Sequence, residues 1–387
     1  MTARTRAGAA ALDGDRLGLT LLEQFKAQGY DPIEPAMLLP ADTVLDHMGE
    51  DIRRRLLLTL DPSGKELCLR PDFTLPVALE HIRRGGGAAR YGYAGVAFRF
   101  PTSTDPLRVS AEFRQAGIED YGAADARAAD AGMVGAALSA IRSVTDRPMR
   151  LSLGDVSVFG AVVGALNLSP AWAQRLHRLF WRHSETGGIA ETVRNGDPGG
   201  ARNTLSAELV HMDPDTARGI VEEVMGIAGV AAVGGRSARD IAGRYVERAR
   251  TAQEGPLSDA VIDALDACLT IDTPPREAVE ALRDLASRHA LDITATIDGL
   301  ESRLGSLESL GIDLGDARFA AAFGRRIEYY TGFVFELRAA GSETVGAIAG
   351  GGRYDRFLSD LGAGRAIPAV GCSIYVDRLS AVAGAAE

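Results

Sequence analysis

The chain has 387 residues and a net charge of −10, from 52 acidic against 42 basic side chains. Its hydrophobic fraction of 46% is enough to build a sizeable core and excludes wholesale disorder. The acidic balance argues against a protein that mainly coats nucleic acid, because neutralising phosphates requires a cationic surplus. The length predicts two or three domains of about 100–200 residues each.

Cysteines and apolar runs indicate the compartment. Cys68, Cys268 and Cys372 lie far apart without CxxC spacing, which argues against a disulfide framework or a zinc site. No apolar run reaches the roughly 18 residues that a membrane helix needs. Residues 1–12 lack a hydrophobic signal core. We therefore expect a cytoplasmic protein with no membrane contact.

The first part of the chain alternates helical and extended segments. Its pattern predicts a helix over residues 17–25 that Gly29 ends, a strand over Glu66–Leu69, a helix that Thr74 caps and Gly85-Gly86-Gly87 end, and two strands over residues 90–100 and 111–122. The two long strands flank an open loop, so an antiparallel hairpin is predicted.

The rest of the chain predicts helices first and then a return to strands. Residues 161–275 read as helical, and further helices follow near residues 276–289 and 297–310. Strands are expected over residues 319–323, 328–337, 345–349 and 369–375, with a turn at Gly350-Gly351-Gly352 and a helix over 354–361. The prediction is a mixed α+β core (1–160 and 276–387) interrupted by a helical insertion (161–275).

One polar cluster lies on the strand over residues 113–119. Strand side chains alternate, so Phe113, Gln115, Gly117 and Glu119 share a face. Gln and Glu on either side of a Gly can line a cradle for a small molecule. The alternative is a solvated face, with Ala116 and Ile118 forming the core on the other side. The residues alone leave these two interpretations open.

A second cluster is Arg325-Arg326-Ile327-Glu328-Tyr329-Tyr330. Its arginines could clamp a carboxylate beside the paired tyrosines, or the segment could be an exposed strand end with salt bridges. Along one strand Arg325 and Tyr330 point to opposite faces, so a shared site needs Arg325 in a loop or a bulge.

Known catalytic patterns are missing. The run at Gly350-Gly351-Gly352 lacks the spacing of a phosphate loop. No GxSxG or HExxH motif occurs, and the six histidines lie outside the polar clusters. The sequence gives no support for a hydrolase, a metal site or a cofactor.

Taken in order, several segments resemble histidyl-tRNA synthetases. They are LRPDFT, FRQAGIEDYG, RRIEYYTGFVFEL, AGGGRYD and AVGCSIYVDRL. The resemblance spans about residues 15–380 and implies the class II aminoacyl-tRNA synthetase core, an antiparallel sheet flanked by helices.

The resemblance also implies a pocket for histidine. By position, Asp72, Thr74 and Gln115 match residues that hold the α-amino group, Glu119 and Tyr330 match residues at the imidazole, Arg325 matches the arginine beside the carboxylate, Arg99 matches the motif 2 arginine, and Tyr329 and Tyr354 fall beside the pocket. The chemistry is consistent, since ammonium groups bind carboxylates and carboxylates bind guanidinium groups.

The chain departs from the synthetases where ATP and tRNA bind. No acid follows Arg99 until Asp105, Tyr375 replaces a glycine of motif 3, and Asp377 replaces its glutamate, although Arg378 remains. The sequence stops nine residues after Arg378, so no anticodon-binding domain is expected.

A histidine pocket without these features resembles a related family, the regulatory subunits of ATP phosphoribosyltransferase. The resemblance implies a subunit without catalytic residues, metal or cofactor. It implies a short-form catalytic subunit as partner, in a hetero-octamer that contains a homodimer of this chain. It further implies histidine as effector and no tRNA. The alternatives are a free-standing histidine-adenylating ligase and a scaffold with a relic pocket.

Overall fold

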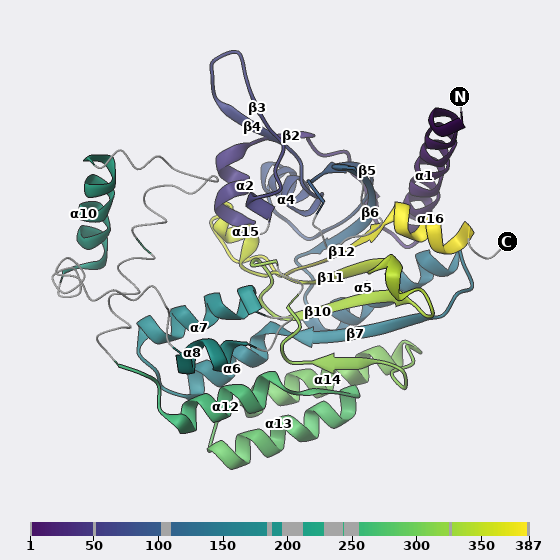
Figure 1. Cartoon of the computed structure of the whole chain (residues 1–387). Coiled ribbons are helices and arrows are strands. Elements are labelled where there is room, and N and C mark those ends of the chain that lie inside the picture. The colour runs from purple at the N-terminus through teal and green to yellow at the C-terminus, as the bar shows by residue number, and fades with distance from the viewer. Residues whose placement is uncertain are drawn as a thin grey trace.

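The computed structural model describes residues 2–48, 52–101, 110–183, 188–195, 212–227, 243, 255–324 and 327–384. In this part of the chain a nine-stranded sheet runs through the centre of the molecule (Figure 1). Its strands, in spatial order, are β1 (Asp31–Pro32), β5 (Ala89–Phe98), β6 (Glu112–Tyr121), β12 (Ala369–Tyr375), β11 (Ala349–Arg353), β10 (Phe333–Ala339), β7 (Met149–Asp155), β9 (Arg318–Ala320) and β8 (Asp272–Thr273).

The pairing is antiparallel except at β1–β5 and β7–β9. The predicted hairpin is confirmed, since β5 and β6 pair along their full length with Tyr93 opposite Gly117. A second, three-stranded sheet of β2 (Leu38–Pro40), β4 (Glu66–Leu69) and β3 (Leu58–Leu60) lies beside it. The predicted α+β fold, a largely antiparallel sheet with helices, is confirmed.

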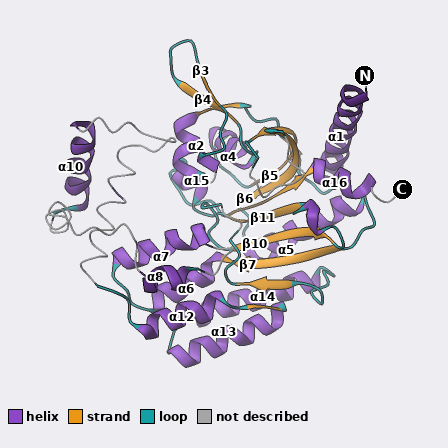
Figure 2. Ribbon diagram, viewed as in Figure 1, coloured by secondary structure: helices purple, strands orange, loops and turns teal. Residues whose placement is uncertain are grey.

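The helices that the structure describes are α1 (Thr2–Ala27), α2 (Ala41–His47), α4 (Thr74–Arg83), α5 (Ala126–Arg142), α6 (Val156–Ala165), α7 (Pro170–His183), α8 (Ile189–Asn195), α10 (Pro214–Ile227), α12 (Asp259–Leu269), α13 (Pro275–His289), α14 (Thr294–Ser309), α15 (Phe357–Asp360) and α16 (Val376–Gly384), with a 3-10 turn, η1 (Glu343–Val345). Figure 2 shows how they surround the strands. No helix among the described residues has the length and apolarity to cross a membrane.

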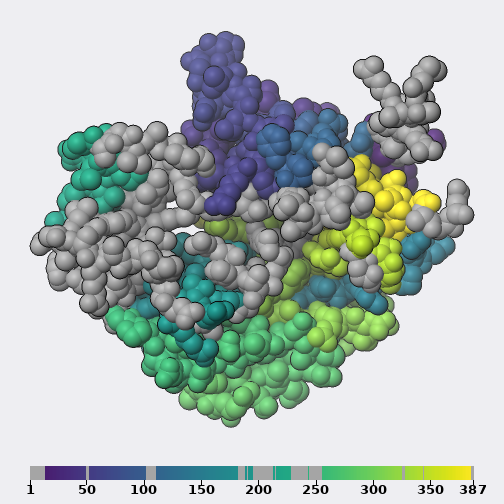
Figure 3. Space-filling model, in the orientation of Figure 1, coloured from purple at the N-terminus to yellow at the C-terminus, as the bar shows by residue number. Residues whose placement is uncertain are grey.

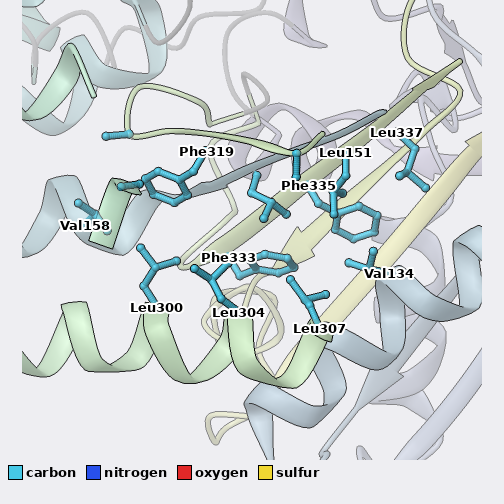
Figure 4. Close-up of a cluster of buried hydrophobic side chains, with 14 of the residues drawn as sticks. Val134, Leu151, Val158, Leu300, Leu304, Leu307, Phe319, Phe333, Phe335 and Leu337 are labelled. Carbon is cyan, nitrogen blue, oxygen red and sulfur yellow. The ribbon is translucent and has the colours of Figure 1, made fainter. Parts of the chain in front are cut away.

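One face of the large sheet packs against helices through an apolar core. The alternating residues Phe333, Phe335 and Leu337 of β10 are buried with Leu304 and Leu307 of α14 (Figure 4). Ala116 and Ile118 of β6 belong to the same cluster, together with side chains of α1 and α5. The 3.6-residue period of the helices and the period of two in the strands bring these side chains into one layer.

A buried ion network lies beside this apolar layer. Arg353 of β11 donates from Nε to Asp130 of α5 at 2.9 Å. Arg303 of α14 donates to the other oxygen of Asp130 at 2.7 Å and to Asp155 at 2.8 Å. Asp130 is fully buried, so its charge is balanced by two guanidinium groups rather than by water.

The opposite face of the sheet carries the odd-numbered side chains of β6. They pack below α4, the small sheet and the turn at residues 327–331, in a second cluster that includes Tyr93, Phe113, Tyr121 and Tyr354. This face holds most of the predicted polar residues.

Four local predictions are wrong. The strand expected over residues 345–349 does not form there, because residues Glu343–Val345 make the 3-10 turn η1 and β11 starts at Ala349. Gly350-Gly351-Gly352 lies inside strand β11 rather than in a turn, because a Cβ on Gly351 would collide with the backbone of β12. The strand expected from residue 328 starts at Phe333. Thr74 is the first residue of α4 and makes no cap, since its hydroxyl bonds to Glu119 instead. The division into domains stays a prediction.

Candidate functional site

The site is centred on Glu119 of β6, whose carboxyl group is completely buried. Thr74 donates from Oγ1 to Glu119 Oε1 at 2.9 Å, and the Tyr93 hydroxyl lies 3.5 Å from the same oxygen. The Tyr354 hydroxyl donates to Oε2. Three elements, α4, β5 and the segment after β11, thus converge on one carboxyl group.

Burial changes the protonation of this carboxyl. It raises the pKa of Glu119 from 4.5 to about 8, against the hydrogen bonds from Tyr354 and Thr74, which lower it. The neighbouring Asp72 raises the pKa further through like-charge repulsion. The carboxyl is therefore largely protonated at neutral pH and carries a donor as well as an acceptor.

Two glycines make room for these groups. A Cβ on Gly371 of β12 would overlap Glu119 Oε2, and it would come within 2.9 Å of the Tyr354 hydroxyl. A Cβ on Gly117 would collide with the Tyr93 phenol. Glycine is needed here for close approach rather than for turning, because both residues lie in paired strands.

Asp72 and Arg99 form the second part of the site. Asp72 lies in the loop before α4 with only 4% of its surface exposed. Burial raises the pKa of Asp72, while the positive charge of Arg99 lowers it. Arg99 follows β5, and its guanidinium lies 5.1 Å from the ring centroid of Phe113.

Gln115 lies on the same face of β6 as Glu119 and is 2% exposed. Its Oε1 is buried and has no hydrogen-bond partner among the described residues. A buried carbonyl oxygen without a partner costs free energy, so it marks a position that can accept a donor from a ligand. The solvated-face alternative for β6 is therefore wrong, because both faces of the strand are buried.

Tyr329 and Tyr330 lie in a turn before β10 and close the site. Their rings contact each other at 4.8 Å, and Tyr329 meets Tyr354 at 5.4 Å between centroids. Because they lie in a turn, the strand alternation that separated Tyr330 from Arg325 does not apply. Arg325 itself lies outside the described residues.

The structure thus brings together most of the predicted site. Thr74, Glu119 and Tyr354 are hydrogen-bonded, Asp72 acts electrostatically on Glu119 and Tyr329, and Gln115 shares the face of Glu119. Sequence reasoning missed Tyr93, Ser373 and Gly371. Tyr93 bonds to Ser373 at 3.0 Å and stacks on Phe73 at 4.5 Å. The alternating aromatic residues of β5 were the available signal for Tyr93.

A stack of side chains occupies the region next to the site. The Arg378 guanidinium lies 4.6 Å from the Tyr375 ring centroid, and Tyr375 lies 6.3 Å from Phe113. Arg378 also donates to the carbonyl of Ala347 at 2.8 Å. Tyr375 therefore contacts a guanidinium and lies tilted beside an aromatic ring.

These features define what the site can bind. Buried carboxyl and amide oxygens from Asp72, Glu119 and Gln115 accept hydrogen bonds from N–H groups, and the phenols of Tyr93 and Tyr354 both donate and accept. The arrangement suits a small polar ligand with several nitrogen atoms.

Comparisons with known proteins identify the family. A family model described as histidyl-tRNA synthetase matches residues 9–218 and 216–379. Proteins named ATP phosphoribosyltransferase regulatory subunit from Brucella canis, Brucella suis and Brucella melitensis are each 38% identical over 364 residues, which covers 93% of this chain and 95% of each relative.

Solved structures share the fold at lower identity. A Bacillus halodurans protein titled ATP phosphoribosyltransferase regulatory subunit/histidyl-tRNA synthetase has a TM-score of 0.66 and 20% identity, covering 95% of this chain and 78% of its own. A histidine–tRNA ligase subunit from Alicyclobacillus acidocaldarius has a TM-score of 0.59 and 22% identity, covering 97% and 94%.

The sheet, the polar pocket and the family match place this chain in the histidyl-tRNA synthetase family, with a class II synthetase-like core. Within that family, the identity over nearly its whole length shows that it belongs to the ATP phosphoribosyltransferase regulatory subunits. Its relatives are thus named as regulatory subunits of a biosynthetic enzyme.

Proposed function

We propose that this chain is a histidine-sensing, non-catalytic subunit that a short-form ATP phosphoribosyltransferase catalytic subunit needs for activity. The complex would carry out the first step of histidine biosynthesis and would be inhibited by histidine through this chain. The observation that carries the proposal is the buried set of Glu119, Thr74 and Tyr354 with Asp72 and Gln115 around it.

The proposed ligand contacts follow from the chemistry of histidine. The α-amino group binds Asp72, Thr74 and the unpartnered Oε1 of Gln115. The imidazole binds Glu119 and Tyr330, with Tyr329 and Tyr354 along its edge. A protonated Glu119 can donate to one imidazole nitrogen, and an ionised one can accept from N–H.

The carboxylate of histidine is assigned to two arginines. Arg99 lies beside Asp72 and is close enough to lower its pKa. Arg325 is proposed as the second cation on the strength of its position in the RRIEYY segment. A guanidinium can bind a carboxylate through two parallel hydrogen bonds.

Tyr375 supports the non-catalytic assignment. It stands where the synthetases have a glycine of motif 3, and its ring contacts the Arg378 guanidinium and lies tilted beside Phe113, so it would crowd an adenine ring at that position. The competing proposal, a free-standing histidine-adenylating ligase, rests on the retained Arg99 and Arg378. An ATP–pyrophosphate exchange assay with histidine separates the two, since sustained exchange would require the ligase.

Regulation would act through a shift between two states of the assembly. Histidine can inhibit only if it binds one state more tightly, and a preference of about 1–3 kcal/mol is typical of allosteric coupling. The buried polar contacts at Glu119 join α4, β5 and β11, so a ligand bound there can bias how these elements pack.

Assembly is supported by exposed apolar side chains on and beside the small sheet. Met37 and Leu38 lie at β2, and Leu58 and Leu60 lie on β3, each between 46% and 64% exposed. The space-filling view shows this region standing out from the surface (Figure 3). We propose that it contributes to a homodimer within a hetero-octamer, because such patches commonly mark interfaces.

Co-expression with a short-form catalytic subunit tests the whole proposal. The two chains should co-purify, the catalytic rate should rise, and histidine should inhibit the complex. Gly371→Ala should abolish the response to histidine by pushing a methyl group into Glu119, with a loss of affinity of about 100-fold. Gly305→Ala on α14, where a Cβ meets nothing within 4 Å, is the matched control.

A further inference from the structure

A cavity outside the amino-acid site has Tyr330 as one of its lining residues. Its volume is about 410 Å³, within the range of small-molecule sites. It lies where α7 meets the core, between α6, α7, the turn at residues 328–331 and Arg356. None of the polar side chains that line it takes part in the histidine site except Tyr330.

One face of α7 points into this cavity. Gln174, His177, Arg178 and Trp181 line it at positions i, i+3, i+4 and i+7, which fall on one side of a helix. The opposite side of α7, with Leu176 and Leu179, is buried in the apolar core. The face of α7 that carries Gln174, His177 and Arg178 therefore lies across the cavity from the turn at residues 328–331.

The charges around the cavity favour an anion. Arg178 of α7 and Arg356, which lies at the N-cap of α15, are both lining residues, whereas Glu328 is the acid among them. His177 and Arg356 line the same cavity. Burial lowers the pKa of the His177 imidazole, and the positive charge of Arg356 lowers it further, so an anion bound between the two side chains would favour the protonated imidazole.

Aromatic rings form the remaining wall. Phe159 and Phe180 stack at 4.8 Å, the His177 ring meets Phe159 edge-on at 6.0 Å, and Trp181 contacts Phe180. The cavity thus combines donors from two elements with an apolar wall. Arginine side chains on two separate elements can together form charge-assisted hydrogen bonds to the oxygens of one phosphate group.

We propose that this cavity is a binding site for a phosphate-bearing small molecule, whose phosphate contacts Arg178, Arg356 and His177 and whose remainder packs against Phe159 and Trp181. The site is distinct from the amino-acid pocket, and the two share Tyr330 as a wall. A ligand there would also bridge α7 and the core.

Ribose 5-phosphate is the probe for this proposal, with ribose as the uncharged control. Titration of the full chain, followed by calorimetry and by the ring resonances of His177, should show saturable binding of ribose 5-phosphate and none of ribose. The His177 resonance is assigned from its loss in His177→Gln. Arg356→Gln should weaken binding about tenfold.

Arg288→Gln is the matched control, because Arg288 is an exposed arginine on α13 that does not line the cavity. It should leave the affinity for ribose 5-phosphate unchanged, as should Glu119→Gln in the amino-acid site. The proposal is overturned if ribose 5-phosphate leaves the His177 resonance unmoved. It is also overturned if Arg288→Gln weakens binding as much as Arg356→Gln.

Discussion

The two faces of strand β6 are both buried, yet they have opposite effects on the stability of the fold. Ala116 and Ile118 pack against helices in an apolar layer, and Gln115 and Glu119 lie on the other side among phenols and a second carboxyl. The first face stabilises the fold, at about 25 cal/mol for each Å² of apolar surface removed from water. The second costs free energy, since polar groups lose hydration.

The free-energy cost of burying these polar groups supports the proposed ligand site on this face of β6. Glu119 has three hydroxyl groups around it, but its pKa still rises to about 8, so the hydrogen bonds do not offset the loss of water. Gln115 keeps a buried oxygen without a partner in the described chain. Apolar residues of similar volume would often give an equally or more stable protein at these positions, and this supports the proposal that the polar residues bind a ligand.

The largest expected effect is on the helix-covered face. Phe335→Ala should lower the free energy of unfolding by about 3–5 kcal/mol, because the fully buried ring leaves a cavity against α14. Urea denaturation measures the change. Phe335→Leu is the matched control and should cost clearly less. A loss below 1 kcal/mol for the alanine variant would contradict the packing described.

The buried ion network of Asp130, Arg303 and Arg353 is the polar exception on the helix-covered face of the sheet. Disrupting it should give the next largest loss of stability. Asp130→Asn should destabilise the fold by about 3 kcal/mol, since Arg353 and Arg303 would keep buried charges without their shared anion. Asp263→Asn is the control, because its pair with Arg194 is solvent-exposed and worth about 0.5 kcal/mol or less. Thermal and urea unfolding of both variants test the difference.

On the polar face, Glu119→Gln should weaken histidine binding by about 10–100-fold while leaving the fold intact. The amide keeps the shape of the side chain, but it has no carboxyl proton to donate or transfer to the imidazole. Calorimetry measures the affinity, and Glu112→Gln at the start of β6, where the side chain is exposed, serves as the control. Unchanged affinity in the Glu119 variant would remove this residue from the proposed pocket.

The same variant tests the raised pKa. The stability that protonated Glu119 contributes is fully present below its unfolded value of 4.5 and is lost as the pH rises through about 8. Wild type should therefore lose stability relative to Glu119→Gln across this window. Urea midpoints recorded between pH 5 and 8 measure the trend, and parallel curves would contradict a buried carboxyl with a raised pKa.

The smallest effect on stability is expected at the exposed patch. Leu60→Ser should change the free energy of unfolding of the monomer by about 0.5 kcal/mol or less, because the side chain is 64% exposed. It should weaken self-association, which sedimentation measures. Val224→Ser on α10, at 44% exposure, is the control for removing an exposed apolar side chain elsewhere. Equal dissociation of both variants would argue against a specific interface.

Much of the site was predictable from residue order. Strand β12 and strand β4 have the predicted bounds, and the β5–β6 hairpin follows from alternation of aromatic and small residues. Alternation also placed Gln115 and Glu119 on one face. The resemblance to histidyl-tRNA synthetases then named Asp72, Thr74 and Tyr354 as neighbours, although these lie far from Glu119 along the chain.

Local patterns failed where distant segments meet. Three glycines in a row are typical of a turn, but β11 needs them because β12 and β10 approach its backbone closely on either side. Thr74 has the residue type of a helix cap, and its hydroxyl is used by Glu119, 45 residues away.

There is a physical reason why some features could be predicted from the sequence and others could not. Periodicity and turn chemistry act between residues close in sequence, so spacing alone predicted most of the elements, the mixed α+β class and which side chains of β6 share a face. Burial, the pKa of Glu119, the position of Tyr375 beside Arg378 and Phe113, and the cavity beside α7 depend on contacts across the folded chain. Desolvation and close packing exist only once those segments are brought together, so only the tertiary structure could decide them.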